Sequence, residues 1–217
     1  MKTALVIGAT GLVGLQTVTC LLENDHYSRV VVFSRRPTGL TSPRLTEHLI
    51  DFADTSAWSH LVQGDVLFSA MGTTRAQAGG KNQQFEVDYT FQYRFAQIAK
   101  QNGVPVFVLV SAAGADPKSR LFYTRIKGEL ERDITALGFP SAIIFKPGPL
   151  EGQREKNRPA ENLMVSIING LNRISLFRKY RPISGHKMAK AMIAAAKNPT
   201  KGVSVFELEE IFLLAER

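Results

Sequence analysis

The chain has 217 residues, of which 44% are hydrophobic and 21% charged, the balance of a soluble globular protein with a substantial core. The single cysteine, Cys20, excludes an intrachain disulfide and a cysteine-based zinc site. No apolar run approaches the roughly 18 residues of a membrane span, and no targeting segment is visible. We therefore predict a cytoplasmic protein with one domain over residues 1–217.

The formal net charge of +8 favours acidic partners such as phosphate-bearing ligands. Part of the surplus is local, because nine Lys or Arg stand against two Glu between residues 154 and 190. This run is either a solvated basic surface or a contact surface for a protein partner. Nucleic acid is the least supported partner, because no motif of stacking aromatic residues accompanies the charge.

The first part of the chain alternates short apolar runs with helical patterns. "TALVIG", at residues 3–8, is an apolar run with β-branched residues that ends at a glycine, as a buried parallel strand does. A helical pattern covers residues 11–22. Further strands are predicted at residues 29–34, within 44–50 and at 65–70, with a short helical stretch around Trp58.

The alternation continues to residue 146, which predicts an α/β fold with a doubly wound, mostly parallel sheet. The elements are a helix from about Gln83 to Gln101, a strand at 104–111, a helix that contains "LFYTRIKGELER" (121–132) and ends at Gly138, and a strand at 141–146. Residues from about 148 to 217 are predicted to form a small cap on the sheet. It contains a loop, helices near 160–170 and at 186–197, a strand at 203–208 and a terminal helix.

The stretch "GATGLVG" places Gly8, Gly11 and Gly14 between the first strand and the first helix. Glycine permits a tight turn, lets a pyrophosphate approach the backbone and allows the helix to pack closely on the strand. The N–H groups and the dipole at the start of a helix attract anions. The loop therefore predicts a dinucleotide site, and its GxxGxxG spacing indicates a different branch of the fold from GxGxxG.

The end of the second strand indicates which dinucleotide binds. An acid there would accept a hydrogen bond from the ribose 2′-hydroxyl of NAD, whereas an arginine accommodates the 2′-phosphate of NADP. The sequence reads "FSRRP", with Ser34, Arg35 and Arg36 and no acid. A forked guanidinium matches a phosphate in geometry and charge, so NADP is predicted in preference to NAD.

Together these motifs resemble those of the atypical short-chain dehydrogenase/reductases, most closely the branch of the Tat-interacting proteins. The matching stretches occur in family order over about residues 3–150, with a weaker match in "RPISGHKMAKAM". They are "GATGLVG", "SRRP", "SAMGTTRAQAG", "VDYT", "SAAGADPKSRLFYTRIKGELE" and "FKPGPL". The resemblance implies a Rossmann fold that binds NAD(P).

The resemblance also implies that Ser111, Tyr123 and Lys127 form a catalytic triad. Hydride transfer to a carbonyl builds negative charge on its oxygen, so a proton donor must stand beside it. The ordinary pKa of tyrosine, about 10, is too high for this task near neutrality, and an ammonium group on the same helix face lowers it. Lys127 would also hold the nicotinamide ribose, and Ser111 would hydrogen-bond the substrate oxygen.

Further cofactor contacts follow from the resemblance alone. Asp51 either borders the adenine with Phe52 or caps a turn. Asp88 stands where many relatives carry an asparagine that serves a proton relay, and this departure counts against the relay. The full set of implied cofactor contacts is Gly8, Thr10, Gly11, Leu12, Val13, Gly14, Ser34, Arg35, Arg36, Asp51, Phe52, Ala70, Met71, Gly72, Thr73, Asp88, Tyr123, Lys127, Pro147, Gly148 and Leu150.

These features predict an NADP-dependent oxidoreductase that acts on a carbonyl or an alcohol, a small molecule whose identity the sequence does not reveal. Two alternatives share the fold: a regulatory or assembly protein that binds NADPH without turnover, and a sugar-nucleotide epimerase, which requires tightly held NAD. The four histidines show no metal-ligand spacing, so no metal site is predicted. A homodimer through the helices near residues 83 and 120, common in relatives, is left open.

Overall fold

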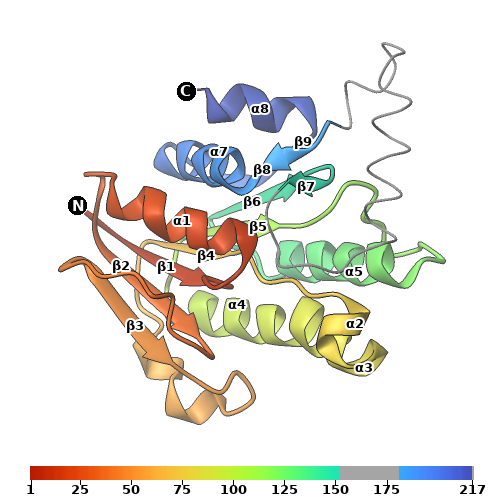
Figure 1. Ribbon diagram of the computed structural model, residues 1–217, viewed down its shortest axis with the longest axis horizontal. Coiled ribbons are helices and arrows are strands. Elements are labelled where there is room, and N and C mark those ends of the chain that lie inside the picture. Colours follow the sequence, from red (N-terminus) through yellow and green to blue (C-terminus); the bar gives the residue numbers. More distant parts are fainter. Residues whose placement is uncertain (152–180, 217) are drawn as a thin grey trace.

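The structure, a computed structural model, describes residues 1–151 and 181–216 (Figure 1). Its centre is a seven-stranded sheet in the order β3-β2-β1-β4-β5-β6-β9, in which all neighbouring strands are parallel. The strands are β1 Lys2–Ile7, β2 Tyr27–Ser34, β3 Leu45–Leu49, β4 Val66–Ser69, β5 Val106–Val110, β6 Ser141–Lys146 and β9 Gly202–Glu207. The strand order reverses between β1 and β4, which confirms the predicted doubly wound sheet.

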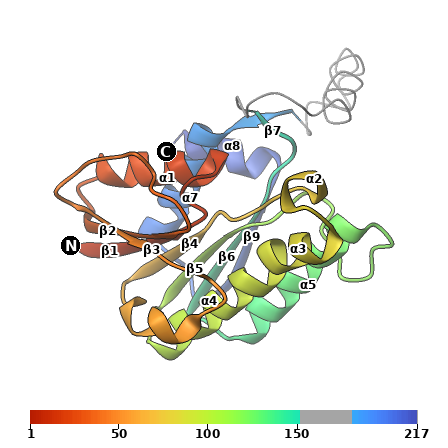
Figure 2. The same ribbon diagram turned by 60° about the horizontal axis from the view of Figure 1, so that its bottom comes forward.

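Helices cover both faces of this sheet (Figures 1 and 2). One face carries α1 (Leu12–Leu22), α7 (Gly185–Lys197) and α8 (Glu209–Ala215). The other carries α4 (Phe91–Gln101) and α5 (Phe122–Ala136). The short helices α2 (Arg75–Ala78) and α3 (Lys81–Phe85) precede α4, and 3₁₀ turns at Thr55–Ala57 and Ser59–Leu61 flank Trp58.

Two apolar cores lie on the two faces, and each central strand contributes to both. In β1, Ala4 and Val6 belong to the core under α1 and α7, whereas Leu5 and Ile7 belong to the core under α4 and α5. All five residues of β5 are buried in the same alternating way. The strands therefore read as continuous apolar runs, because both faces are covered.

The helix predicted from about Gln83 to Gln101 is present but interrupted. Residues Glu86–Thr90 form a π-helical turn between α3 and α4. The buried amide of Gln92 donates to the backbone carbonyls of Val87 (3.3 Å) and Asp88 (2.8 Å). A side chain that enters the backbone ladder in this way accounts for the change of helical pitch.

The remaining predicted elements within the described residues are confirmed to within a few positions, and β9 forms one edge of the sheet. A two-stranded pairing joins β7 (Leu150–Glu151) to β8 (Ile183–Ser184). The helix predicted near 160–170 and most of the basic run between 154 and 190 lie outside the described residues. That residues from about 148 to 217 form a cap on the substrate side stays a prediction.

Among residues 1–151 and 181–216, no helix is long and apolar enough to cross a membrane. The same part of the chain contains no cluster of three or more His, Cys, Asp or Glu that could hold a metal ion.

Candidate functional site

The glycine loop lies at the carboxyl end of β1. Gly8 has a φ of +81°, and a Cβ atom there would lie 2.5 Å from the backbone carbonyl carbon of Ala70. A Cβ atom at Gly14 would overlap the backbone of Gly8, so only glycine lets α1 start this close to the loop. Gly11 precedes α1, and no side chain caps this helix end, so its first N–H groups are available to an anion. Close backbone packing and uncapped N–H groups are features that a bound pyrophosphate would use.

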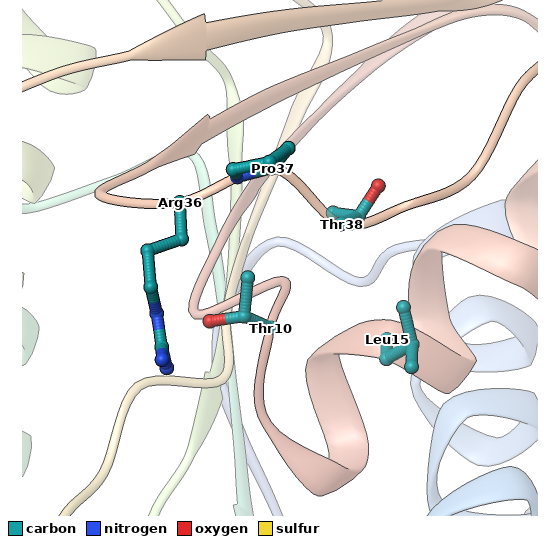
Figure 3. Close-up of a pocket in the computed structure, with 5 residues that line it drawn as sticks. All are labelled: Thr10, Leu15, Arg36, Pro37 and Thr38. Atoms are coloured by element: carbon teal, nitrogen blue, oxygen red, sulfur yellow. The ribbon is translucent and has the colours of Figure 1, made fainter.

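A cavity of about 420 Å³ opens beside the loop. Figure 3 shows the Arg36 side chain extending alongside Thr10, whose hydroxyl oxygen points toward it. Ser34 donates a hydrogen bond to the carbonyl of Arg36 (2.6 Å), which fixes the turn after β2, and Arg35 in that turn is exposed. The cavity therefore presents a guanidinium and hydroxyl groups, the donors that a phosphate needs. Its lining residues are Thr10, Leu15, Arg36, Pro37 and Thr38.

The residues after β3 combine a turn with the apolar core. The Asp51 carboxylate accepts a hydrogen bond from the backbone N–H of Ala53 (2.9 Å), which is the turn that its sequence context allowed. Phe52 is 3% exposed, and its ring stacks on Phe91 with the ring centres 5.7 Å apart. The Phe52 ring is thus committed to packing, so contact of Asp51 and Phe52 with an adenine stays a prediction.

Asp88 connects the π-helical turn to the segment after β4. Its buried carboxylate accepts hydrogen bonds from the backbone N–H of Thr73 (3.0 Å) and from the Gln84 side chain (3.2 Å). These contacts hold the stretch that begins with Ala70, the residue against which Gly8 packs. Along this stretch Met71 is buried, Ala70 and Thr73 are half-buried and Gly72 is exposed.

The residues of the predicted triad come from the end of β5 and the first turns of α5. Ser111 follows β5 directly and is 4% exposed, and its backbone N–H donates to the carbonyl of Phe145 in β6 (2.8 Å). Lys127 is 2% exposed, and its Nζ donates to the carbonyl of Val110, the residue before Ser111, at 3.4 Å. Tyr123, one turn earlier on α5, is 43% exposed. The lysine is therefore buried beside Ser111, and the tyrosine lies at the surface of the same helix.

Burial lowers the pKa of Lys127, and the carboxylates of Asp88 and Glu131 act in the opposite direction. In the unfolded chain, lysine keeps its proton up to a pH near its ordinary pKa of about 10.4. Between the lowered pKa and this ordinary value, the unfolded state binds more protons than the folded state. The free energy of unfolding therefore rises with pH across this window.

We predict that Lys127→Met stabilises the protein at pH 7 by about 1 kcal/mol, because it removes a charge that burial disfavours. The variant should also lose the rise in stability with pH above neutrality. Urea denaturation at pH 7 and pH 10 measures both effects, and Lys201→Met, at an exposed position, is the matched control. A less stable Lys127→Met variant with an unchanged pH dependence would contradict the prediction.

Two charged residues of this region were missed by the sequence analysis. Glu131 of α5 accepts a hydrogen bond from the Ser111 hydroxyl, and it forms an ion pair with Lys146 Nζ at 3.2 Å. The signals were present: Glu131 stands four residues after Lys127, on the same helix face, and Lys146 is a charge that ends an apolar strand. Neither signal says that the two side chains meet, because that depends on how α5 packs on β6.

The residues after β6 complete this edge of the sheet. The carbonyl of Pro147 accepts a hydrogen bond from the backbone N–H of Ala113 (2.9 Å), which ties this loop to the residues after Ser111. Gly148 is half-buried and Leu150 is 37% exposed. Closure of Pro147, Gly148 and Leu150 over a nicotinamide stays a prediction.

Comparison with known proteins shows the family of the chain. A family model described as NAD(P)H-binding matches residues 8–159, which include the glycine loop and the segment from Ser111 to Lys127. The chain belongs to this NAD(P)H-binding family. "Protein FMP52, mitochondrial" from Debaryomyces hansenii is a relative with 35% identity over 223 residues, covering 96% of this chain and 97% of the relative.

Solved structures of NAD-bound proteins share the fold of this chain. The Bordetella bronchiseptica enzyme WbmH, in complex with NAD⁺, superposes with a TM-score of 0.71 at 18% identity, over 95% of this chain and 75% of that chain. A short-chain dehydrogenase/reductase superfamily protein from Agrobacterium tumefaciens, with bound NAD, gives 0.68 at 15% identity, over 94% and 77%. The solved structures show the predicted Rossmann fold, and the NAD(P)H-binding family and the FMP52 relatives are consistent with the predicted resemblance to atypical short-chain dehydrogenase/reductases.

The predicted cytoplasmic location is wrong. The relatives named FMP52, from D. hansenii and from other fungi, carry the word mitochondrial in their names. The prediction rested on the single cysteine and on the lack of a visible targeting segment. A lone cysteine is compatible with any reducing compartment, so it does not tell one such compartment from another.

Proposed function

We propose that this NAD(P)H-binding protein is an NADP-dependent oxidoreductase that interconverts a carbonyl and an alcohol. The observation that carries the proposal is Lys127, a lysine buried at the carboxyl end of a central strand. It lies beside Ser111 and one helical turn from the exposed Tyr123. An apolar core does not need a lysine there, whereas a proton-transfer site does. The names of the relatives also support a mitochondrial location for this chain.

The bound cofactor would supply hydride to the carbonyl carbon of the substrate, or accept it from the alcohol. The glycine loop and the start of α1 would hold its pyrophosphate, since the glycines leave the backbone open and the first N–H groups of α1 carry no side-chain cap. Tyr123 would give its proton to the carbonyl oxygen, which becomes a hydroxyl. Lys127 in its charged form, which burial disfavours and which Asp88 and Glu131 favour, would stabilise the resulting tyrosinate. Ser111 would hydrogen-bond the substrate oxygen.

Arg35 and Arg36 support NADP as the cofactor. We predict that the double variant Arg35→Ala, Arg36→Ala binds NADPH about 100-fold more weakly and binds NADH with little change. Each charge-assisted hydrogen bond to the 2′-phosphate contributes about 1.5 kcal/mol, and the loss of two such bonds gives about this factor. Calorimetric titration of both nucleotides into the native protein and the variant measures the effect.

Arg29→Ala is the matched control, because Arg29 is an exposed arginine near the opposite end of β2. It should leave both affinities unchanged. Equal losses of NADPH and NADH in the double variant would show that the two arginines do not select the 2′-phosphate. NADPH binding without turnover of any carbonyl would favour the regulatory alternative.

A further inference from the structure

The Ser111 hydroxyl is already engaged in the folded chain. Its Oγ donates to Oε1 of Glu131, a carboxylate on α5 that is itself largely buried. A serine hydroxyl has one hydrogen to donate and lone pairs that accept. While its hydrogen points at Glu131, Ser111 can accept from a substrate hydroxyl but cannot donate to a substrate carbonyl. The state of Glu131 therefore decides what Ser111 can do.

Glu131 connects this hydroxyl to the edge of the molecule. Its Oε2 lies 3.2 Å from Lys146 Nζ, and the same Nζ lies 3.5 Å from Glu207 Oε1. The side chains of Glu131 and Lys146 are 15% and 16% exposed, whereas that of Glu207 is 53% exposed. Ser111 follows β5, and Glu131, Lys146 and Glu207 belong to α5, β6 and β9. The strands β5, β6 and β9 are neighbours in the sheet, and α5 covers one of its faces (Figure 2).

The groups around Glu131 counteract the effect of burial on its pKa. Burial raises the pKa of Glu131, and the Ser111 hydrogen bond, Lys146 and Lys127 act against this rise. Lys127 is in turn influenced by Asp88 from the π-helical turn. A carboxyl held between burial and two ammonium groups can gain or lose a proton with small changes in its surroundings.

We propose that Glu131 is a positioning residue that sets the direction of the Ser111 hydrogen bond to the substrate. When Glu131 is ionised, Ser111 donates to it and accepts from a substrate alcohol. When Glu131 is protonated, its carboxyl O–H donates to Ser111, and the Ser111 hydrogen turns to a substrate carbonyl. Ionised Glu131 thus suits an alcohol substrate, and protonated Glu131 suits a carbonyl substrate. This inference rests on the proposed oxidoreductase function.

The side-chain carboxyl carbon of Glu131 reports its titration directly, without any turnover. NMR of protein labelled with ¹³C at the glutamate carboxyl carbon, with Glu131→Gln to assign the signal, gives the midpoint. We expect a midpoint above that of the exposed glutamates, and a further upward shift in Ser111→Ala and in Lys146→Met, because each removes a group that favours the carboxylate. A midpoint that neither substitution moves would overturn the proposal.

The pH profile of carbonyl reduction tests the consequence, with NADPH and 9,10-phenanthrenequinone as the probe. In the native protein, kcat/KM for carbonyl reduction should decline as the pH rises through the Glu131 midpoint, because the protonated form of Glu131 leaves the Ser111 hydrogen free for the carbonyl. Glu131→Gln should lose this step, because the Gln amide N–H₂ donates to Ser111 at every pH while its oxygen accepts from Lys146. Glu129→Gln, on the same helix, should keep it. A step that persists in Glu131→Gln would overturn the proposal.

The two tests separate this inference from the proposed function. If NADPH binds but the native protein does not reduce the quinone, the proposed function is weakened and the NMR titration still decides whether Ser111 and Glu131 are coupled. If Glu131→Gln does not fold, the glutamate signal whose midpoint moves in both Ser111→Ala and Lys146→Met identifies Glu131, and the NMR test proceeds in chains with Glu131 intact.

Discussion

Tyr123→Phe is expected to lower kcat for carbonyl reduction by about 10²–10⁴-fold, the usual contribution of a positioned proton donor. The substitution removes only the hydroxyl, and Tyr123 is 43% exposed, so the fold should be preserved. Affinity for NADPH should change by less than about tenfold, since at most one hydrogen bond to the cofactor is lost. Steady-state kinetics with the quinone probe and calorimetry with NADPH measure the two quantities.

Tyr93→Phe is the matched control for this experiment. Tyr93 is half-buried on α4 and stacks on Tyr89, and it is not among the predicted site residues, so its hydroxyl should be dispensable. Equal activity in native protein and Tyr123→Phe would remove Tyr123 from the chemistry. In a regulatory protein that binds NADPH without turnover, Tyr123→Phe should also leave the biological effect intact.

Gly8→Ala is expected to destabilise the protein by at least about 3 kcal/mol and to abolish dinucleotide binding. Two costs combine at this position. The left-handed backbone conformation at position 8 costs an alanine about 1–2 kcal/mol. Its Cβ would also lie 2.5 Å from the Ala70 carbonyl carbon, which is a backbone atom that can move only with β4 and the segment after it. Urea denaturation and NADPH titration measure the two losses.

Gly39→Ala separates these two costs. Gly39 has a φ of +79°, close to that of Gly8, but no atom lies within 4 Å of a Cβ built there. Gly39→Ala should lower the free energy of unfolding by only about 1–2 kcal/mol, from backbone strain alone, and should bind NADPH normally. If the two variants are equally unstable, close packing of the glycine loop against Ala70 is not what requires glycine at position 8.

The sheet and the cofactor loop were predictable because local sequence determines them. A parallel strand covered on both faces, such as β5, is apolar at every position, and this pattern is visible without a structure. The glycine loop was predictable for a related reason. A pyrophosphate and a helix start impose backbone requirements that only glycine meets, so the residue type itself reports the geometry.

The features that were not predicted depend on contacts between distant segments. At the π-helical turn the Gln92 amide donates to two backbone carbonyls, and the Phe52 ring stacks on Phe91. The pairing of Glu131 with Lys146 requires α5 and β6 to meet. The location of the protein depends on delivery, on which the folded domain itself has no bearing.

Calorimetric titration of NADPH and NADH into the native protein is the decisive measurement. We expect both nucleotides to bind and NADPH to bind at least about tenfold more tightly, because two arginines and no acid follow β2. If neither nucleotide binds, the proposed dinucleotide site is contradicted, and Tyr123 and Lys127 have no role in hydride transfer.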